Sequence, residues 1–202
     1  GHAMLLIESG GIIQVNDNQI EHPSTSGPSL VRINDGGRIR ITSPQGLYNG
    51  STGAALVASN QLNYFIEPDG IVEYTGTYDQ WITGSNDTQK QYGILEINKT
   101  AGKAYASTTN TRIRRSLRLV NGELDLNGKT LTIGDGNSNA ITRQYGYLKS
   151  DTEAGRIVLV NPCSGEHLIP FGSAPNIYHP VIFRLNSSSL SPLTVSTWPT
   201  SV

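Results

Sequence analysis

The sequence predicts an all-β protein: a right-handed parallel β-helix-like solenoid with a C-terminal hairpin-rich β unit that caps one end. Short alternations of apolar and polar residues recur along the chain, and a glycine-bearing corner joins each alternation to the next. No long segment shows the apolar spacing of an amphipathic helix. Twenty-two glycines among 202 residues supply the turns that many short strands require.

The repeated pattern is clearest in residues 117–133. Pairs of alternating apolar residues are separated there by Asn121-Gly122 and Asn127-Gly128, two dipeptides that favour turns. This arrangement predicts three very short strands, with a change of chain direction after each of the first two.

The same pattern occurs four more times upstream, in residues 5–15, 30–41, 64–74 and 94–102. The five corner glycines lie about 20 to 33 residues apart, which is the length of one solenoid coil with variable loops. They are Gly11, Gly37, Gly70, Gly102 and Gly122. We therefore expect residues 5–140 to form stacked rungs.

The period of two along these strands predicts which side chains are buried. Leu124 and Leu126 should face the core and Asp125 should be exposed, because successive side chains of a strand point to opposite faces. Leucine, isoleucine and valine should point inward throughout the rungs, with the arginine, glutamate and threonine residues between them outward. Pairing between rungs should be parallel.

The two ends of the chain differ from the repeated rungs. Residues 1–4 have the composition of a cleaved-tag remnant, and Leu5 already lies within a rung, so we expect the chain to be part of a larger parent polypeptide. After Ile133 the strands lengthen and prolines become frequent. We place a boundary near residue 141 and expect residues 141–202 to cap the solenoid, because an uncovered rung would leave backbone N–H and C=O groups unpaired.

The charge and composition exclude several partners. Charged residues make up 15% of the chain and the net charge is −1, so no basic surface is available for nucleic acid. No apolar run is long enough to span a bilayer, and membrane insertion is not expected. The single cysteine, Cys163, cannot form an internal disulfide, so packing and strand pairing must hold the fold.

Several motifs of the second half resemble a known kind of protein. They are residues 91–97, residues 117–126, residues 139–141 with 146–148, and residues 169–172. Together they are similar to a repeat-bearing, β-helix-like region of large secreted or surface-displayed proteins of Bacteroidetes. The resemblance implies extracellular display, a parallel β-helix-like body and sorting signals elsewhere in the parent protein. It implies no catalytic site.

Aromatic residues are concentrated around residues 64–81. The candidate ligand-binding residues are Tyr64, Tyr74, Tyr78, Asp79 and Trp81. Pyranose rings pack against flat aromatic faces, and a solenoid offers a long surface on which a row of rings could follow a polysaccharide. The Asp79 carboxylate could hydrogen-bond sugar hydroxyls. An alternative interpretation is that Tyr64 and Tyr74 are strand residues packed in or on the rung.

One turn has the start of a calcium-loop pattern. Asp135, Asn137 and Asn139 carry oxygen-bearing side chains at alternate positions, and alternate residues of a tight turn can point toward one calcium ion. They are the candidate metal ligands, and no other cofactor is expected. No glutamate follows to close the coordination sphere, and an ordinary Asp-Gly turn is the alternative.

These observations predict a non-catalytic structural or adhesive module, secreted or displayed at the cell surface. It could bind polysaccharide or another cell-surface ligand through exposed aromatic residues. No nucleophile, acid–base pair or metal cluster stands out, so no catalytic residue is assigned. The alternative is a β-helix carbohydrate-active enzyme, a polysaccharide lyase or a glycoside hydrolase, acting through Glu73 and Asp79. Glycoside hydrolysis would require two carboxylates about 5 to 10 Å apart across a cleft.

Overall fold

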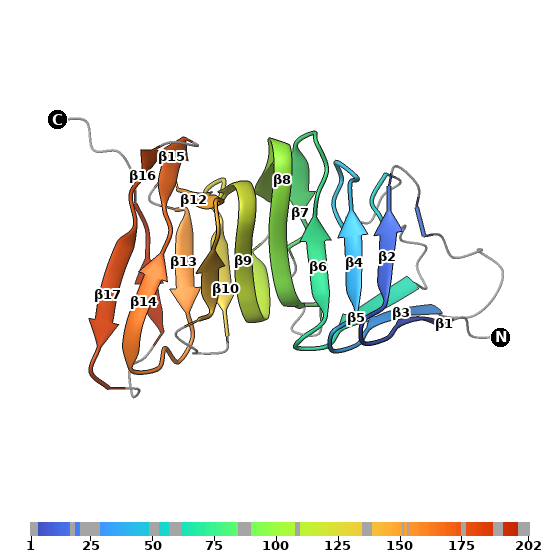
Figure 1. Cartoon of the computed structure of the whole chain (residues 1–202), viewed down its shortest axis with the longest axis horizontal. Helices are drawn as coiled ribbons and strands as arrows, with labels where there is room; N and C mark the ends of the chain where they lie inside the picture. Colours follow the sequence, from blue (N-terminus) through green and yellow to red (C-terminus); the bar gives the residue numbers. More distant parts are fainter. Residues whose placement is uncertain are drawn as a thin grey trace.

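The structure is a computed structural model, and the described residues form a parallel β-solenoid of about five turns. They are residues 4–16, 19–20, 29–48, 53–56, 62–84, 90–107, 110–134, 139–150, 152, 154–174, 177–187 and 192–197. Figure 1 shows the rungs following one another along the longest axis, from β2 near the N-terminus to β17 near the C-terminus. Within these residues all the elements are strands, and no helix could cross a membrane. The predicted fold class is confirmed.

Three parallel strands form the first sheet of the solenoid. They are β1 (Met4–Ile7), β3 (Ser29–Ile33) and β5 (Leu62–Ile66). Ile7 pairs in register with Ile33, which pairs with Ile66. All three side chains are buried, so one column of isoleucines joins the first three rungs. The predicted inward direction of the apolar residues is confirmed here.

A longer sheet follows the chain through the remaining rungs. Its path contains β2 (Ile12–Val15), β4 (Arg38–Ile41), β6 (Ile71–Tyr74), β8 (Tyr92–Ala106), β9 (Thr111–Asp125), β10 (Thr130–Ile133) and β13 (Arg156–Leu159). Three shorter strands pair beside this path, namely β7 (Gln80–Ile82), β11 (Ile141–Arg143) and β12 (Tyr147–Lys149). All these pairs are parallel, as predicted.

β8 and β9 are each 15 residues long, because both strands pass through a corner without ending. Gly102 and Gly122 take backbone φ angles of 61° and 86° there, a region that glycine enters at no steric cost. The prediction of three short strands in residues 117–133 is therefore wrong at Asn121-Gly122, where the strand bends and continues. It is correct at Asn127-Gly128, where the chain turns between β9 and β10.

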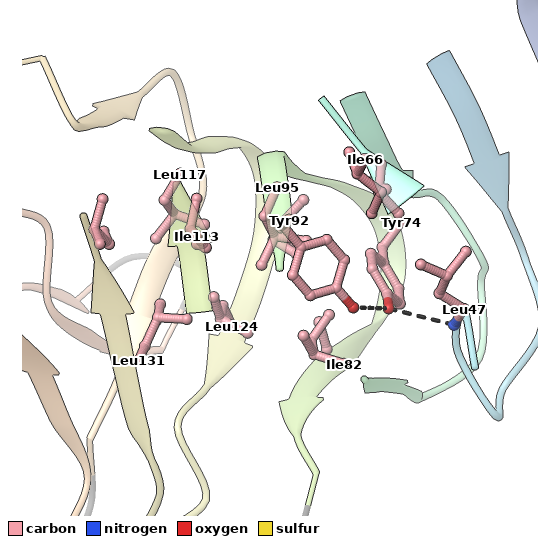
Figure 2. Close-up of a cluster of buried hydrophobic side chains, with 14 of the residues drawn as sticks. Leu47, Ile66, Tyr74, Ile82, Tyr92, Leu95, Ile113, Leu117, Leu124 and Leu131 are labelled. Atoms are coloured by element: carbon pink, nitrogen blue, oxygen red, sulfur yellow. Dashed lines mark hydrogen bonds between the residues drawn. The ribbon is translucent and has the colours of Figure 1, made fainter. Parts of the chain in front are cut away.

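Apolar columns fill the interior of the longer sheet. Val72, Leu95, Leu117 and Ile141 pair in register across β6, β8, β9 and β11, and all four are buried. Burying each such side chain contributes roughly 1.5–3 kcal/mol. Figure 2 shows part of this core, with Leu95, Leu117 and their neighbours packed between the strands.

Two tyrosines lie inside the core, and their hydroxyl groups hydrogen-bond to each other. The hydroxyls of Tyr74 and Tyr92 are 2.7 Å apart, and the Tyr74 hydroxyl also accepts a hydrogen bond from the Leu47 backbone N–H (Figure 2). Burial raises the pKa of both phenols, so both remain neutral. A buried hydroxyl without a partner would destabilise the fold, and this pairing avoids that penalty.

The prediction for residues 124–126 holds for the two leucines only. Leu124 and Leu126 are buried, but Asp125 is also only 9% exposed, so its predicted exposure is wrong. Asp125 pairs in register with Tyr105 on one side and Lys149 on the other. Its Oδ1 accepts a hydrogen bond from the Asn127 backbone N–H, and its Oδ2 lies 3.1 Å from the Lys103 ammonium, so partners within the fold engage both oxygens.

The outer side of the longer sheet carries an in-register ladder of charges. Arg40, Glu73, Glu96 and Arg118 pair in succession across β4, β6, β8 and β9. The two carboxylates are neighbours, and like charges on adjacent strands repel each other. Arg38 resolves the conflict, because its Nη1 lies 2.5 Å from Glu73 Oε2 and 2.6 Å from Glu96 Oε1.

Glu73 is the most enclosed member of this charge ladder. It is 2% exposed, and it accepts hydrogen bonds from Arg38, Arg40 and Asn98. Burial by itself would raise the pKa of Glu73, but these three hydrogen bonds outweigh burial and hold the pKa below its usual 4.5. Glu73 therefore stays ionised and links three rungs.

The C-terminal part forms the predicted hairpin-rich cap. β14 (Gly165–Ile169) pairs antiparallel with β17 (Val181–Leu185), and β15 (Gly172–Ala174) pairs antiparallel with β16 (Ile177–Tyr178). β18 (Leu193–Val195) pairs antiparallel with the outer edge of β13. Figure 1 shows β14 and β17 at the C-terminal end of the molecule. Parallel pairing continues through β13, and an isolated parallel bridge joins Leu148 to Phe171, so the predicted boundary near residue 141 stays a prediction.

Replacing Gly93 tests the close stacking of successive rungs. A Cβ at this position would lie 2.0 Å from the Glu67 carbonyl oxygen, so Gly93→Ala must push β8 away from the preceding corner. We expect the free energy of unfolding to fall by about 3 kcal/mol in urea titrations, as for other overpacked cores. Gly134→Ala is the control, because its Cβ would be 3.6 Å from the nearest atom. Equal stability of the two variants would contradict this stacking.

Replacing Glu73 by glutamine tests the charge ladder. The folded-state pKa of Glu73 is lowered, so the stability it contributes is present above about pH 4.5 and is lost as the pH falls through the folded pKa. Glu73→Gln should lower the free energy of unfolding at pH 7 by about 1–3 kcal/mol, because it removes the charge from the hydrogen bonds that Arg38 and Arg40 donate to Glu73. It should also flatten the acid part of the stability profile. The control is Glu166→Gln, at an exposed position. If the two variants show the same dependence of stability on pH, the role assigned to Glu73 in the charge ladder is refuted.

Candidate functional site

Segments of β7, β8, β9 and β12 carry two in-register rows of polar and aromatic side chains. One row runs from Trp81 in β7 through Tyr105 and Asp125 to Lys149. The other runs from Lys103 through Glu123 to Tyr147. These rows alternate along each strand with buried residues such as Ala104, Leu124 and Leu148, and therefore lie on the outer side. We call the seven side chains the Trp81 face.

The aromatic part of the Trp81 face is a stacked pair of rings. The ring centroids of Trp81 and Tyr105 are 5.0 Å apart, with 30° between the ring planes. Trp81 is 40% exposed despite this contact. The Lys103 ammonium lies 4.6 Å from the Tyr105 centroid and 3.1 Å from Asp125 Oδ2. The rings are thus held in place by neighbours on the same face and remain accessible.

Asp79 orients Tyr105 from the corner before β7. Its Oδ1 accepts a hydrogen bond from the Lys103 backbone N–H, and its Oδ2 accepts one from the Tyr105 hydroxyl. The bond from Tyr105 is the main reason that the pKa of Asp79 lies below its usual value, and the same bond raises the pKa of Tyr105 to about 12. Asp79 therefore remains a carboxylate that positions the aromatic stack.

A buried lysine holds the corner that carries Asp79. Lys99 is 1% exposed, and its ammonium donates to the carbonyls of Gly76 and Tyr78 and to Gln80 Oε1. Burial lowers the pKa of Lys99 to about 8, against 10.5 for an ordinary lysine. All three donors of the ammonium have acceptors in the protein. The corner between β6 and β7 is therefore pinned to β8 from the inside.

A cleft of about 630 Å³ adjoins the Trp81 face at the corners of β8 and β9. Its polar and aromatic lining consists of Lys99, Thr100, Asn121, Glu123, Arg143, Tyr145 and Tyr147. We call it the Glu123 cleft. It adjoins the Trp81 face because Glu123 and Tyr147 line the cleft and also belong to that face. Tyr145 is 68% exposed and forms an open aromatic wall.

Tyr147 and Arg143 fix two sides of the Glu123 cleft. The Tyr147 hydroxyl donates to Glu123 Oε2 over 2.6 Å, and burial together with this bond raises the pKa of Tyr147, so the hydroxyl keeps its proton. Arg143 Nε donates to the Gly146 carbonyl at 2.9 Å, and its guanidinium lies 4.1 Å from the ring centroid of Tyr178 in the cap. A residue of the cap therefore packs against one of the side chains that line the cleft.

The structure divides the five predicted ligand-binding residues into two groups. Tyr78, Asp79 and Trp81 lie together and exposed, at the corner before β7 and in β7 itself. Tyr64 is 7% exposed and Tyr74 is fully buried, so these two belong to the core and cannot offer a ring to a surface ligand. The prediction of one row of exposed rings from residue 64 to residue 81 is corrected accordingly, because the two tyrosines point inward with the apolar residues of their strands.

The sequence pattern did not reveal several members of the site. Tyr105, Glu123 and Tyr147 come from later rungs and reach the site only through strand register. An alignment of successive rungs at the outward positions would have brought them together with Trp81. That alignment requires knowing how the chain bends within β8 and β9, which the glycine spacing alone does not specify.

The two carboxylates of the alternative enzyme hypothesis lie in different parts of the rung. Glu73 in β6 pairs with Glu96 in the first half of β8, whereas Asp79 contacts Lys103 and Tyr105 near the end of β8. Both oxygens of each carboxylate already accept hydrogen bonds from neighbouring groups. The structure does not bring Glu73 and Asp79 together as a pair for acid–base chemistry.

The predicted calcium ligands fall mostly outside the described residues. Asp135 and Asn137 are not described, and Asn139 is an exposed residue just before β11. In the part of the chain that the structure describes, no three histidine, cysteine, aspartate or glutamate side chains gather to hold a metal ion. Calcium binding at this turn stays a prediction.

No protein-family model, curated protein or solved structure matches this chain. The resemblance of the second half to a Bacteroidetes repeat region therefore stays a prediction. Function is inferred below from the geometry of the Trp81 face and the Glu123 cleft.

The titration of Lys99 gives a test of how the site is built. Between pH 8 and pH 10.5 the unfolded chain binds a proton at this residue that the folded chain does not, so the free energy of unfolding should rise with pH across this window. The full rise is on the order of 3 kcal/mol. Urea titrations at pH 8, 9 and 10 should show that Lys99→Met removes the rise.

Lys129→Met, at a half-buried lysine in the turn before β10, is the matched control and should keep the rise. A Lys99→Met protein with the pH profile of the parent would show that the Lys99 ammonium is not desolvated in the folded chain.

Proposed function

We propose that this protein is a non-catalytic structural and adhesive module, secreted or displayed at the cell surface, whose Trp81 face binds polysaccharide. The observation that carries the proposal is the accessible stack of Trp81 on Tyr105, placed in register beside the Glu123 cleft. Sugar rings have apolar C–H faces that pack on aromatic rings and hydroxyls that hydrogen-bond to charged groups. Both kinds of partner occur on this one surface.

The spacing of the rungs suits a repeating ligand. Neighbouring strands lie about 4.7–4.9 Å apart, so the four strand segments of the Trp81 face present their side chains at a regular interval along the solenoid. The charged groups on this face are of both signs, with Lys103 and Lys149 beside Asp125 and Glu123. A regular, mixed surface of this kind favours an extended chain with many hydroxyl groups over a compact charged ligand.

The surroundings of the carboxylates support a binding role. Glu73 is held by Arg38, Arg40 and Asn98, and Asp79 by Tyr105 and Lys103. A carboxylate held in this way is a structural or positioning group, because a general acid or base needs a free path to its substrate. The proposed extracellular location rests on the resemblance of the second half to surface-displayed repeat regions.

Truncating Trp81 tests the proposal. Trp81→Ala should weaken retention on immobilised polysaccharides at least tenfold, which corresponds to about 1.4 kcal/mol for the loss of one exposed stacking ring. Affinity electrophoresis in gels containing soluble polysaccharides and pull-down on insoluble ones would measure it. Ile12→Ala is the control, because Ile12 is 56% exposed and lies in β2, away from the Trp81 face.

Two outcomes would contradict the proposal. Retention that is the same in the parent protein and in Trp81→Ala would remove the role of the aromatic stack. Release of reducing or unsaturated ends by the parent protein, lost in Asp79→Ala, would show that the module is an enzyme.

A further inference from the structure

The Glu123 carboxylate has unused capacity to accept hydrogen bonds. Tyr147 donates to Oε2, but none of the residues that the structure describes donates to Oε1, which is buried. A carboxylate can accept about four hydrogen bonds, and a buried acceptor without a donor destabilises a protein by about 1–3 kcal/mol. The torsion that ends a glutamate side chain is broad, so rotation about it can turn the unpaired oxygen toward the cleft.

The cations of the Glu123 cleft, Lys99 and Arg143, already donate to other groups of the protein. The three donors of the Lys99 ammonium are taken by Gly76, Tyr78 and Gln80. The Arg143 guanidinium uses three of its five N–H groups, which donate to the backbone carbonyls of Gly146 at 2.9 Å, Tyr145 at 3.4 Å and Gln144 at 3.5 Å. Among the described residues of the cleft, the buried side-chain atom without a partner is an acceptor, Glu123 Oε1.

From the unpaired Glu123 oxygen we infer that the Glu123 cleft is a specificity subsite that binds a neutral or amino sugar unit in preference to uronic acids and sulfated sugars. The inference rests on the proposed polysaccharide-binding function and names the class of sugar. A sugar hydroxyl or ammonium group supplies the donor that Glu123 lacks. The exposed ring of Tyr145 packs against the C–H face of the same sugar.

An acidic sugar fits this cleft poorly for two reasons. Its carboxylate or sulfate brings no donor for Glu123, and it places a second negative charge beside the first. The Lys99 ammonium cannot donate to this acidic group, because all three of its donors are engaged, and two N–H groups of Arg143 are the donors that remain on the cations of the cleft. Discrimination of this kind arises because leaving a buried polar group unpaired is costly.

The test uses matched sets of methyl glycosides with the gluco, galacto and manno configurations. Each set contains the neutral sugar, its 2-amino derivative and its uronate. Binding is followed by two-dimensional NMR through the amide signals of residues 99–102, 121–123 and 143–147. We expect at least one neutral or amino sugar to shift these signals and its uronate counterpart to bind at least tenfold more weakly. Uronates that bind equally well, or no shift with any neutral or amino sugar, would overturn the inference.

Glu123→Gln is the decisive variant, because it keeps the shape of the side chain and the acceptor for Tyr147 but places an amide donor where the unpaired oxygen was. The dissociation constant for the preferred sugar should rise at least tenfold, and the preference over the uronate should shrink because the repelling charge is gone. A variant that perturbed only the fold would weaken both sugars together. Glu166→Gln is the control, and Tyr145→Ala, at an exposed position, should weaken binding without a change in thermal midpoint.

Polysaccharide retention separates this inference from the proposed function. Retention that depends on Trp81 but is unchanged in Glu123→Gln would overturn the subsite and leave the proposed function standing. Sugar binding that is lost in Glu123→Gln, with retention independent of Trp81, would support the subsite and refute the role of the Trp81 face.

Discussion

In a parallel solenoid each strand residue lies about 4.7–4.9 Å from its counterparts on the neighbouring rungs, so a side chain and its counterpart are always in contact. For apolar residues this is favourable, and columns such as Val72, Leu95 and Leu117 result. For charged residues it creates a conflict, as between Glu73 and Glu96. The Arg38 guanidinium, from the adjacent row, offsets the repulsion because it forms ion pairs with both carboxylates. Stability therefore depends on how each outward row is neutralised as well as on the core.

The same constraint assembles the site. Trp81 and Tyr105 meet because their strands are in register, and Glu123 lies between Lys103 and Tyr147 for the same reason. The corners matter as much as the strands, because the direction in which β7 leaves the corner depends on the buried ammonium of Lys99. Small displacements at this corner would change the alignment of the aromatic stack. The interior and the surface of this region are thus coupled through one lysine.

Much of the fold could be predicted from sequence, because alternation and corner glycines act locally. The site was only partly predictable. Tyr78, Asp79 and Trp81 are neighbours in sequence and were found together, whereas Tyr105 and Glu123 required knowledge of register. Tyr64 and Tyr74 were assigned to the surface although each is in phase with a buried residue, Ile66 and Val72 respectively. For these two residues the alternation indicates burial, whereas the affinity of aromatic rings for sugars suggests a surface position.

The polar groups of this protein are distributed unequally between the sheets and the Glu123 cleft. On the longer sheet both oxygens of Glu73 accept hydrogen bonds, from Arg38, Arg40 and Asn98. At the cleft the Lys99 ammonium is fully engaged, but Glu123 Oε1 has no donor within the described part of the chain. Four buried side-chain oxygens of the described residues lack a hydrogen-bond partner, and Glu123 Oε1 is the one that belongs to a carboxylate and lies beside an open aromatic wall. Such an unpaired acceptor is expected where a ligand completes the structure, because the interaction lost in the free protein is regained when the ligand binds.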